Sequence, residues 1–566
     1  MKQWVHRDSH GATLLDKLLE SRGVKSESER EQFLHPDFGH DTHDPLLMKD
    51  MDLAVARIAG AVKRNERIVV FGDYDADGIP GAAVLHSFFE KIAYENFETY
   101  IPDRYSEKYS LAEESLRAFA SRGTRVVISV DCGITDVYEA TVARELGIDL
   151  IITDHHLTPD VLPAAYAVIN NKRADDTYPF KYLCGAGTAF KLVQALCRSG
   201  KFVVGKEFER EVLDLVAIAT VCDMVPLVGE NRAIVSEGLK FLRTSERVGI
   251  KALCKKLNIK QEFMSEDDIG YLIGPRINIS SRMAHGSDAL HLLTTHDALL
   301  ANTIASQLQA RNKERRENVE VIMSHVQERW MSHESRSVLV AGHESWRMGV
   351  LGLTASRLVE NHARPVFLWT RNHLGEIKGS ARSDGTVSVV DMLKHAGGDD
   401  FFKNFGGHEM AGGFSLDSTR ENELPDRLER AYEKAEKLKS EQEKIYYDAE
   451  LVASEANWQT YKSFEALAPF GKENPKPTFL LTNLELESVK EMGESANHIE
   501  LTFKDKVGGK PLKAMGFFMT KKDYPNLDFA PGTRLDILFN LEKSYMRGFA
   551  ELRFRLIDIR SSTGLE

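Results

Sequence analysis

Short apolar runs alternate with amphipathic stretches over the first third of the chain. Between these runs the apolar residues recur at helical spacing, as Leu116 does with Phe119 and Ala120. Strands that alternate with helices are typical of βαβ units, so the pattern predicts a doubly wound domain with a parallel sheet. The runs expected to be buried strands are IVVF (68–71), FETYI (97–101), RVVISV (125–130), LII (150–152) and AAYAVI (164–169).

The rest of the chain predicts three further elements of organisation. Residues 297–330 contain neither Gly nor Pro and have apolar residues at helical spacing, which predicts a helix of roughly 50 Å at 1.5 Å per residue. A second α/β pattern follows, with strands at 337–342 and 365–370, a glycine-rich stretch at 405–416 and a charged helical stretch, Ser418–Lys444. After it, short alternating stretches such as NHIELTFKD and RLDILFN predict a small antiparallel barrel.

Composition narrows the class of protein. The 566 residues are 42% hydrophobic and 28% charged, which excludes a disordered, collagenous or coiled-coil chain. The net charge of −12 means that a nucleic acid would have to bind through local basic patches. The five cysteines form no CxxC pair, and no stretch resembles a signal peptide or a membrane span. We therefore expect a cytoplasmic protein that does not contact a membrane.

Three of the expected strands end in acidic turns. Because ligands of parallel sheets bind outside the carboxyl ends of the strands, these turns are expected to converge on one crevice. One such aspartate alone would be read as a turn or capping residue, but three clusters with two adjacent histidines predict a metal site. Asp223 follows another apolar run and is a further candidate, with a helix-end cap as the alternative. The clusters are Asp73, Asp75 and Asp77, then Asp131, then Asp154, His155 and His156.

The residue types indicate which metal and which reaction. Carboxylates with one or two imidazoles suit Mn²⁺ or Mg²⁺, and no paired thiolates suggest zinc. Two ions about 3.5 to 4 Å apart can activate a water and stabilise the leaving oxygen of a phosphodiester, so hydrolysis of a phosphoryl substrate is predicted. Neither CGAGTAF (184–190) nor any other stretch completes a dinucleotide-binding or Walker-A motif.

Four motifs resemble those of the DHH phosphoesterase superfamily. They are GDYDADG, VDCG, TDHH and VCDMVPL, in that order. Within the superfamily, nearly the whole chain resembles the single-stranded-DNA-specific 5′ to 3′ exonucleases, and GPRIN (274–278), KGSARS (378–383), FGGHEMAGG (405–413) and PFGKENPKPTF (469–479) support this. The resemblance implies two α/β domains, DHH and DHH-associated, joined by the long helix and followed by an OB-fold barrel. The expected bounds are an N-terminal segment 1–45, a DHH catalytic domain 46–240, a helical connector 241–335, a DHH-associated substrate-binding domain 336–444 and an OB-fold domain 445–566.

The resemblance also implies roles for individual residues. Asp75 and Asp131 would hold one ion, while Asp77, Asp131, His155 and Asp223 would hold the other. His156 would contact the scissile phosphate, Asp154 would orient the histidines, and Asp73 is expected to be structural. The residues implied for the 5′ phosphate are Arg104, Arg282, Ser380 and Arg382, with His408 reaching the substrate from the second domain.

Other basic and aromatic residues have two readings each. Arg311, Lys313, Arg315 and Arg316 could line a DNA path, but we interpret them as a solvated helix face. In the barrel, lysines alternate with aromatic residues, a mixture that single-stranded nucleic acid requires. We expect Phe503 and Phe517 to be barrel core, and Tyr109 and Tyr545 to be the candidates for base stacking.

The chain departs from the family at three places. Ile79, Pro80 and Gly81 follow DADG, where the family usually has a small hydroxyl residue. The usual Gly-Tyr-Gly is Lys108, Tyr109 and Ser110, and Arg347 stands where a histidine is usual. These positions concern substrate positioning and not the metal ligands.

The sequence thus predicts a metal-dependent exonuclease that degrades single-stranded DNA from the 5′ end to 5′ mononucleotides in recombination and repair. Its expected partners are single-stranded DNA and a helicase or single-strand-binding protein. One alternative is a phosphodiesterase of the same superfamily that acts on short oligonucleotides or cyclic dinucleotides. The other is a non-catalytic replication or repair scaffold that binds DNA.

Overall fold

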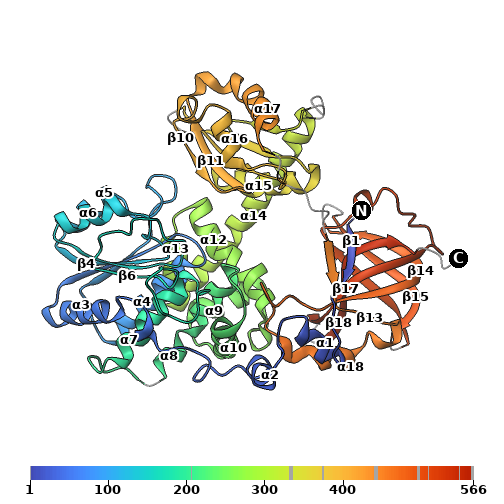
Figure 1. Ribbon diagram of the computed structural model, residues 1–566, viewed down its shortest axis with the longest axis horizontal. Coiled ribbons are helices and arrows are strands. Elements are labelled where there is room, and N and C mark those ends of the chain that lie inside the picture. Colours follow the sequence, from blue (N-terminus) through green and yellow to red (C-terminus); the bar gives the residue numbers. More distant parts are fainter. Residues whose placement is uncertain are drawn as a thin grey trace.

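The computed structural model describes residues 2–205, 207–330, 336–372, 375–436, 438, 444–493, 497–507, 509–546 and 549–562. It has three folded parts (Figure 1). A parallel α/β domain and a helical connector form one part, a smaller α/β domain is the second, and a barrel with the N-terminal segment is the third. This arrangement confirms the predicted fold class.

The first sheet is parallel throughout, as its alternating pattern predicts. Its strand order is β3 (Phe97–Tyr100), β2 (Arg67–Gly72), β4 (Thr124–Val130), β5 (Asp149–Thr153) and β6 (Ala167–Ile169). β6 is shorter than the expected 164–169. The helices of this domain are α3 (Met51–Arg64), α4 (Gly78–Lys91), α5 (Glu113–Ser121), α6 (Val137–Glu145), α7 (Gly185–Arg198), α8 (Phe208–Glu211), α9 (Leu213–Cys222) and α10 (Gly229–Thr244).

Helices cover both faces of this sheet, so its strands are buried on both sides. Alternate residues of β2 belong to different cores: Ile68 and Val70 pack with α3, α4 and α7, whereas Val69 and Phe71 pack with α5 and α6. The carboxyl ends of the strands therefore remain as the open edge of the domain.

A helical connector leads from this domain to the next. It consists of α11 (Val248–Leu257), η2 (Gln261–Phe263), η3 (Asp268–Ile273), α12 (Gly274–Met283), α13 (Ser287–Thr294) and the 33-residue α14 (Ala298–Trp330). The long helix predicted from residues 297–330 is thus continuous, and it leads to the second α/β domain (Figure 1).

The second domain has a mixed sheet in the order β10 (Asn404–Gly407), β11 (Ala411–Leu416), β9 (Ile377–Arg382), β8 (Val366–Arg371) and β7 (Leu339–Gly342). Its helices are α15 (Met348–His362), α16 (Val389–His395) and α17 (Leu424–Lys434). The expectation that Ser418–Lys444 is helical is wrong at its end, because α17 stops at Lys434 and Lys444 begins strand β12 (Lys444–Tyr447).

The C-terminal barrel is closed. Its strands run β14 (Thr478–Met492), β15 (His498–Val507), β16 (Lys510–Phe517), β18 (Phe549–Ser561) and β17 (Arg534–Met546), and β17 pairs with β14 again. β13 (Ala449–Glu450) extends β14, and α18 (Trp458–Phe464) packs beside the barrel. Phe503 lies in the core as expected, but Phe517 is only half-buried because its ring packs under Arg553 and Arg555 at the surface.

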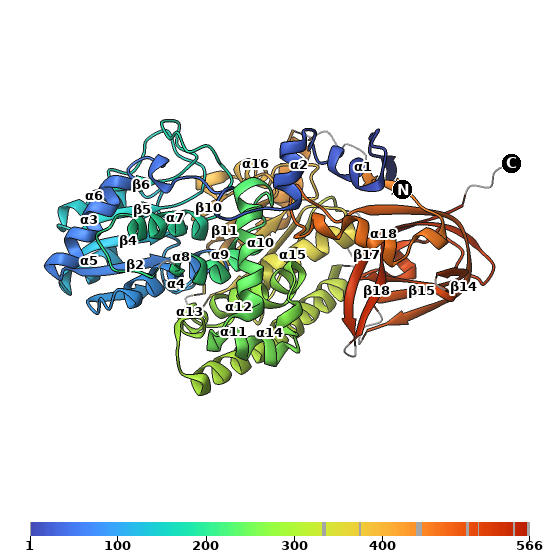
Figure 2. The ribbon, with the colours of Figure 1, turned by 90° about the horizontal axis from the view of Figure 1, so that it is seen from below.

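The first part of the N-terminal segment, residues 3–34, packs on this last domain, whereas Phe38 belongs to the core of the first domain. β1 (Gln3–His6) pairs in parallel with β12, and the indole N–H of Trp4 donates to Asp558 at 2.8 Å. α1 (Leu14–Glu20) and α2 (Glu27–Leu34) contribute Leu18, Leu19 and Phe33 to the barrel's core. Figure 2 shows α1 beside α18.

Among the helices in the described part of the chain, none combines the length and apolar character that crossing a bilayer requires.

Candidate metal centre and phosphate-binding residues

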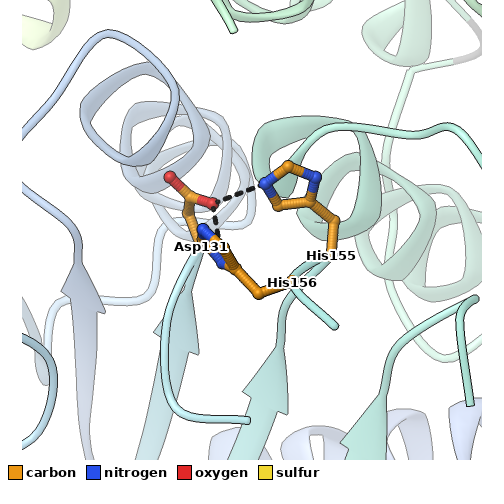
Figure 3. A group of neighbouring side chains, drawn as sticks. All are labelled: Asp131, His155 and His156. Carbon is orange, nitrogen blue, oxygen red and sulfur yellow. Dashed lines mark ion pairs between the residues drawn. The ribbon is translucent and has the colours of Figure 1, made fainter. Parts of the chain in front are cut away.

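The acidic turns meet at the carboxyl edge of the parallel sheet. Asp131 directly follows β4 and faces His155 and His156, which follow β5 (Figure 3). Its Oδ1 lies 3.2 Å from Nε2 of His155 and 3.9 Å from Nδ1 of His156. Asp131 has a φ of 62°, a left-handed conformation that is rare for a residue other than glycine and turns its carboxylate into the site.

Gly185 makes the close approach of α7 to this site possible. A Cβ atom at this position would lie 2.4 Å from Oδ1 of Asp131. The backbone N–H groups of Gly185 and Ala186, at the start of α7, donate to Asp77 at 2.6 and 2.8 Å. The first turn of α7 therefore fixes one carboxylate while leaving room for another.

Among the described residues, three groups of side chains have ligand atoms that lie within 4.8 Å of one another. They are Asp77 with His155 and Asp223, Asp131 with both histidines, and Asp73 with Asp75 and Asp131. Asp223 reaches the site from the C-cap of α9, so it is a helix-end residue and a member of the cluster at once. The structure thus brings together Asp75, Asp77, Asp131, His155, His156 and Asp223.

Several buried atoms of the cluster have no hydrogen-bond partner among the described residues. These are Oδ1 of Asp73, Oδ1 of Asp131, Oδ2 of Asp223 and Nδ1 of His155. Buried polar atoms are normally satisfied, and several carboxylate oxygens without a hydrogen-bond partner in one place are suited to bind a cation. A set of carboxylate oxygens with one imidazole suits Mn²⁺ or Mg²⁺, so the residues fit the expected metals.

The electrostatics of the cluster show the same need for positive charge. Burial and the neighbouring carboxylates raise the pKa of Asp73 and of Asp223 to about 8, and raise that of Asp77 to about 6. Burial lowers the pKa of His155 to about 3, which keeps its ring neutral. A neutral imidazole among repelling carboxylates is the state in which histidine binds a metal.

Asp154 holds the two histidines in place. Its Oδ1 accepts hydrogen bonds from the backbone N–H groups of His155 and His156 and from Nδ1 of His156, all between 2.7 and 3.1 Å. Burial alone would raise the pKa of Asp154, but these hydrogen bonds lower it. The hydrogen bond between Asp154 and Nδ1 of His156 raises the pKa of His156, whose side chain is 48% exposed. His156 is therefore oriented and accessible from the crevice.

Two of the expected phosphate-binding residues lie beside the acidic turns. Arg104 packs over the ring of Tyr74 at 4.7 Å. Burial and the charge of Arg104 lower the pKa of Arg282 to about 10, so Arg282 remains charged at neutral pH and lies in the same region as Arg104. The hydroxyl of Tyr105 donates to the Arg282 carbonyl at 2.5 Å.

The other two expected phosphate-binding residues, Ser380 and Arg382, are on β9 of the second domain. Nη1 of Arg382 donates to Oγ of Ser380 at 3.3 Å. Helix α15 lies against both pairs, since a Cβ at Gly349 would lie 2.2 Å from the Arg282 carbonyl and one at Gly352 would lie 2.8 Å from Nη2 of Arg382. One turn of α15 thus connects the phosphate-binding candidates of the two domains.

The remaining candidates differ in their surroundings. His408 is exposed in the turn between β10 and β11. Tyr109 is 49% exposed, with its ring 5.8 Å from that of Tyr74. Tyr545 stacks on Phe263 at 4.2 Å, so one face of its ring is already covered.

Two residues near the cluster are not among the predicted ligands. Asp73, expected to be structural, has a carboxylate oxygen close to those of Asp75 and Asp131. Lys172 is half-buried, and burial lowers its pKa while Asp223 and Asp154 oppose this effect. The available signal for Lys172 was its position just beyond β6, at the edge where the acidic turns meet.

The departures from the family pattern have structural explanations. Pro80 is in the first turn of α4, where a backbone N–H needs no helical partner. Ser110 has a φ of 67°, a conformation that favours glycine, and its hydroxyl donates a hydrogen bond to Asp136. Arg347 pairs with Glu314 of α14 at 2.6 Å.

The arginines of α14 also separate into two kinds. Arg311 pairs with Asp288 at 2.5 Å, and Lys313 lies 3.7 Å from Glu317. Nε of Arg315 is buried without a hydrogen-bond partner in the described structure. The reading of this cluster as a solvated face therefore fits Arg311 and Lys313 better than Arg315.

Comparison with known proteins agrees with this architecture. Three family models match: the DHH family N-terminal domain at residues 67–220, the DHHA1 domain at 335–441 and the RecJ OB domain at 447–558. A single-stranded-DNA-specific exonuclease RecJ from Dickeya dadantii is 32% identical over 94% of this chain and 94% of its own length. That of Bacillus subtilis is 35% identical over 94% of this chain, which spans 65% of the length of that relative.

Solved structures show the same likeness. A Thermus thermophilus RecJ in complex with Mn²⁺ has a TM-score of 0.78 and 26% identity, covering 98% of this chain and 76% of its own. An exonuclease RecJ bound to manganese has a TM-score of 0.60 and 31% identity, covering 68% of this chain and 95% of its own. The resemblance found in the motifs is thereby confirmed over nearly the whole chain. The chain belongs to the RecJ family of single-stranded-DNA-specific exonucleases.

Proposed function

We propose that this chain degrades single-stranded DNA from its 5′ end and releases 5′ mononucleotides, with two Mn²⁺ or Mg²⁺ ions in the cluster at the sheet edge. The observation that supports this most is the set of unsatisfied buried carboxylate oxygens around a neutral His155. The similar RecJ structures in complex with Mn²⁺ and Mg²⁺ support the choice of metal. Bound there, two ions would supply an activated water and stabilise the charge of the leaving oxygen.

The residues of the chain divide the remaining work. Asp75 and Asp131 would hold one ion, and Asp77, Asp131, His155 and Asp223 the other. His156 is held by Asp154 at 2.8 Å and is partly exposed, so it can donate a hydrogen bond to the scissile phosphate. Because the contact with Asp154 raises its pKa, His156 is the histidine of the pair that more readily carries a proton.

The direction of digestion rests on recognition of the 5′ end. Arg104, Arg282, Ser380 and Arg382 would bind the terminal phosphate, because guanidinium groups match phosphate oxygens in geometry and charge. Their proximity to α15 would place the 5′ end between the two α/β domains. His408 would contact the strand from the second domain, and Tyr109 would stack on a base.

The domains have complementary roles in this proposal. Catalysis is assigned to residues 46–240, phosphate binding to 336–444, and contact with the incoming strand to the barrel at 445–566, with residues 241–335 as the connector. We propose that the protein is cytoplasmic and acts in recombination and repair together with a helicase or a single-strand-binding protein. All of these domains would take part in that role.

The test is digestion of a single-stranded oligonucleotide labelled at either end, with a duplex as control. Asp131→Ala should abolish digestion, whereas Asp160→Ala, an exposed aspartate beyond the cluster, should leave it unchanged. Mononucleotides released from the 5′ end of single strands only would support the proposal. If only very short strands are cut, the small-substrate phosphodiesterase is favoured; if long strands bind but survive, the non-catalytic scaffold is.

A further inference from the structure

The stretch PFGKENP (469–475) contributes none of the candidate metal-binding or phosphate-binding residues. It lies in residues 466–476, a segment that leads directly into the first barrel strand and that we call the joint segment. The joint segment passes between helix α10 of the DHH domain and the barrel, so it is where the two parts are fastened.

Arg232 of α10 is buried against this segment. Its exposed fraction is 2%, and no carboxylate within the described chain forms an ion pair with it. All five of its N–H donors are used, and every acceptor is a backbone carbonyl. Nε donates to Phe33 at 2.8 Å, Nη1 to Leu467 and Pro469 at 2.9 and 3.1 Å, and Nη2 to Ala466 and Ala468 at 3.2 and 2.9 Å.

This guanidinium therefore joins three parts of the chain. It originates in the DHH domain, four of its acceptors are in the joint segment, and the fifth is in α2 of the N-terminal segment. The ring of Phe33 also packs over the guanidinium carbon at 4.2 Å. Desolvation lowers the pKa of Arg232 to about 10, which leaves it charged at neutral pH.

Other buried contacts hold the same segment. Asn474 is fully buried and donates to Leu467 and Pro469, while its Oδ1 accepts from Arg22 at 2.8 Å. The backbone N–H of Phe470 donates to Glu266 of the connector at 3.0 Å, and that of Leu227 donates to Lys472 at 2.8 Å. Lys476 pairs with Asp267 of the connector and, at 2.7 Å, with Glu542 of β17.

Beside the joint segment the connector and the barrel meet through a few discrete contacts, such as the stack of Tyr545 on Phe263 at 4.2 Å. The connector, the end of α10 and the barrel enclose a groove of about 1080 Å³, lined among others by Phe263, Arg243 and Tyr545. A groove of this size contributes little packing between the domains, so specific contacts such as those of Arg232 must hold the barrel in its orientation.

We propose that Arg232 is a positioning residue that fixes the barrel relative to the catalytic cleft and so sets how tightly strands long enough to reach both are bound. This rests on the proposed function, in which the barrel contacts the incoming strand. Two binding surfaces held at a fixed spacing act with a high effective concentration on one strand, and a loosened joint lowers it. The binding of strands too short to reach the barrel does not depend on the joint segment.

The test compares Arg232→Met with wild type on a strand of 40 nucleotides and one of 6. We expect the ratio of kcat/KM for the long strand to that for the short strand to fall roughly tenfold, through KM for the long strand, with kcat on the short strand within about twofold. Arg243→Met is the matched control, because Arg243 is on the same helix but donates to Met264 of the connector. It should keep the wild-type ratio.

The length ratio separates positioning from a merely structural role. A variant that is only partly folded loses activity on both strands equally, and its ratio does not change. An unchanged ratio in folded Arg232→Met would overturn the proposal. If that variant does not fold, Lys476→Met, which loosens the same joint from the barrel side, decides in its place by the same ratio.

Small-angle X-ray scattering gives a readout that does not depend on catalysis. The maximum dimension of Arg232→Met should exceed that of wild type and of Arg243→Met, and equal dimensions would contradict the proposal. If wild type fails to digest DNA, the proposed function fails, but the scattering comparison still reports on the joint.

Discussion

Replacing Asp131 by asparagine is expected to abolish digestion and, at the same time, to stabilise the metal-free protein. Asp131 is 3% exposed, and its ligand oxygen lies within 4.8 Å of oxygens of Asp73 and Asp75. Asparagine keeps the shape of the side chain and removes one negative charge from the group. A residue that serves the metal is therefore a source of repulsion when the metal is removed.

The size of the effect follows from this spacing. Two like charges 4.8 Å apart repel by about 3 kcal/mol at an effective dielectric constant of about 20. Burial and the neighbouring carboxylates raise the pKa of Asp131, so proton uptake relieves part of the repulsion at low pH and less of it as the pH rises. At pH 8 we expect a net gain of about 1–2 kcal/mol, or roughly 2–8 °C in Tm.

The assay is thermal unfolding in EDTA and in Mn²⁺ between pH 6 and 9. The advantage of Asp131→Asn over wild type in EDTA should grow with pH, and Mn²⁺ should raise the Tm of wild type but not of the variant. Asp136→Asn is the control, because Asp136 is also buried but accepts hydrogen bonds from Ser110 and Leu111 and should be destabilised. A lower Tm of Asp131→Asn in EDTA would refute the reasoning.

Three further outcomes are expected. Gly185→Ala should reduce activity by roughly 100-fold or more, because a Cβ there would lie 2.4 Å from Oδ1 of Asp131; near-normal Mn²⁺-dependent rates would contradict this. Gly352→Ala should displace Arg382 and raise KM about tenfold for 5′-phosphorylated strands only, so equal effects on 5′-hydroxyl strands would count against it. Contacts with Lys476 and Arg553 lower the pKa of Glu542 from 4.5 to about 2, although burial alone would raise it. Ionised Glu542 should therefore contribute about 3 kcal/mol to the free energy of unfolding above pH 4.5. Its advantage over Glu542→Gln in urea unfolding should disappear as the pH falls from 4.5 towards 2, and a constant difference would show that the ion pairs are not responsible.

Local patterns in the sequence were sufficient to predict those elements whose conformation depends on residues close to one another in the chain. The parallel sheet follows from buried runs such as 125–130, and the acidic turns after β2, β4 and β5 had to converge once those strands were parallel. The long α14 was equally visible, because 33 residues without a helix breaker leave few alternatives.

Contacts between distant segments had no such signal. Arg232 resembles any other arginine on an amphipathic helix, and only the fold shows that it is buried against residues 466–469. Likewise, Tyr545 alternates with lysines as a stacking residue would, yet Phe263 from the connector covers one face of its ring. The motifs predict a structural role for Asp73, whereas the geometry places its carboxylate oxygen among those of Asp75 and Asp131.

The pairing of β1 with β12 has a consequence for how the molecule is made. Gln3 lies opposite Lys444, so during translation the early segment waits roughly 20–90 s, at about 5–20 residues per second, before its partner leaves the ribosome. Leu18, Leu19 and Phe33 are exposed to solvent or to chaperones for at least that time, because they pack with residues 456–559, which are synthesised later still. The DHH domain can fold meanwhile, but the barrel is completed only when the first and last parts of the chain meet.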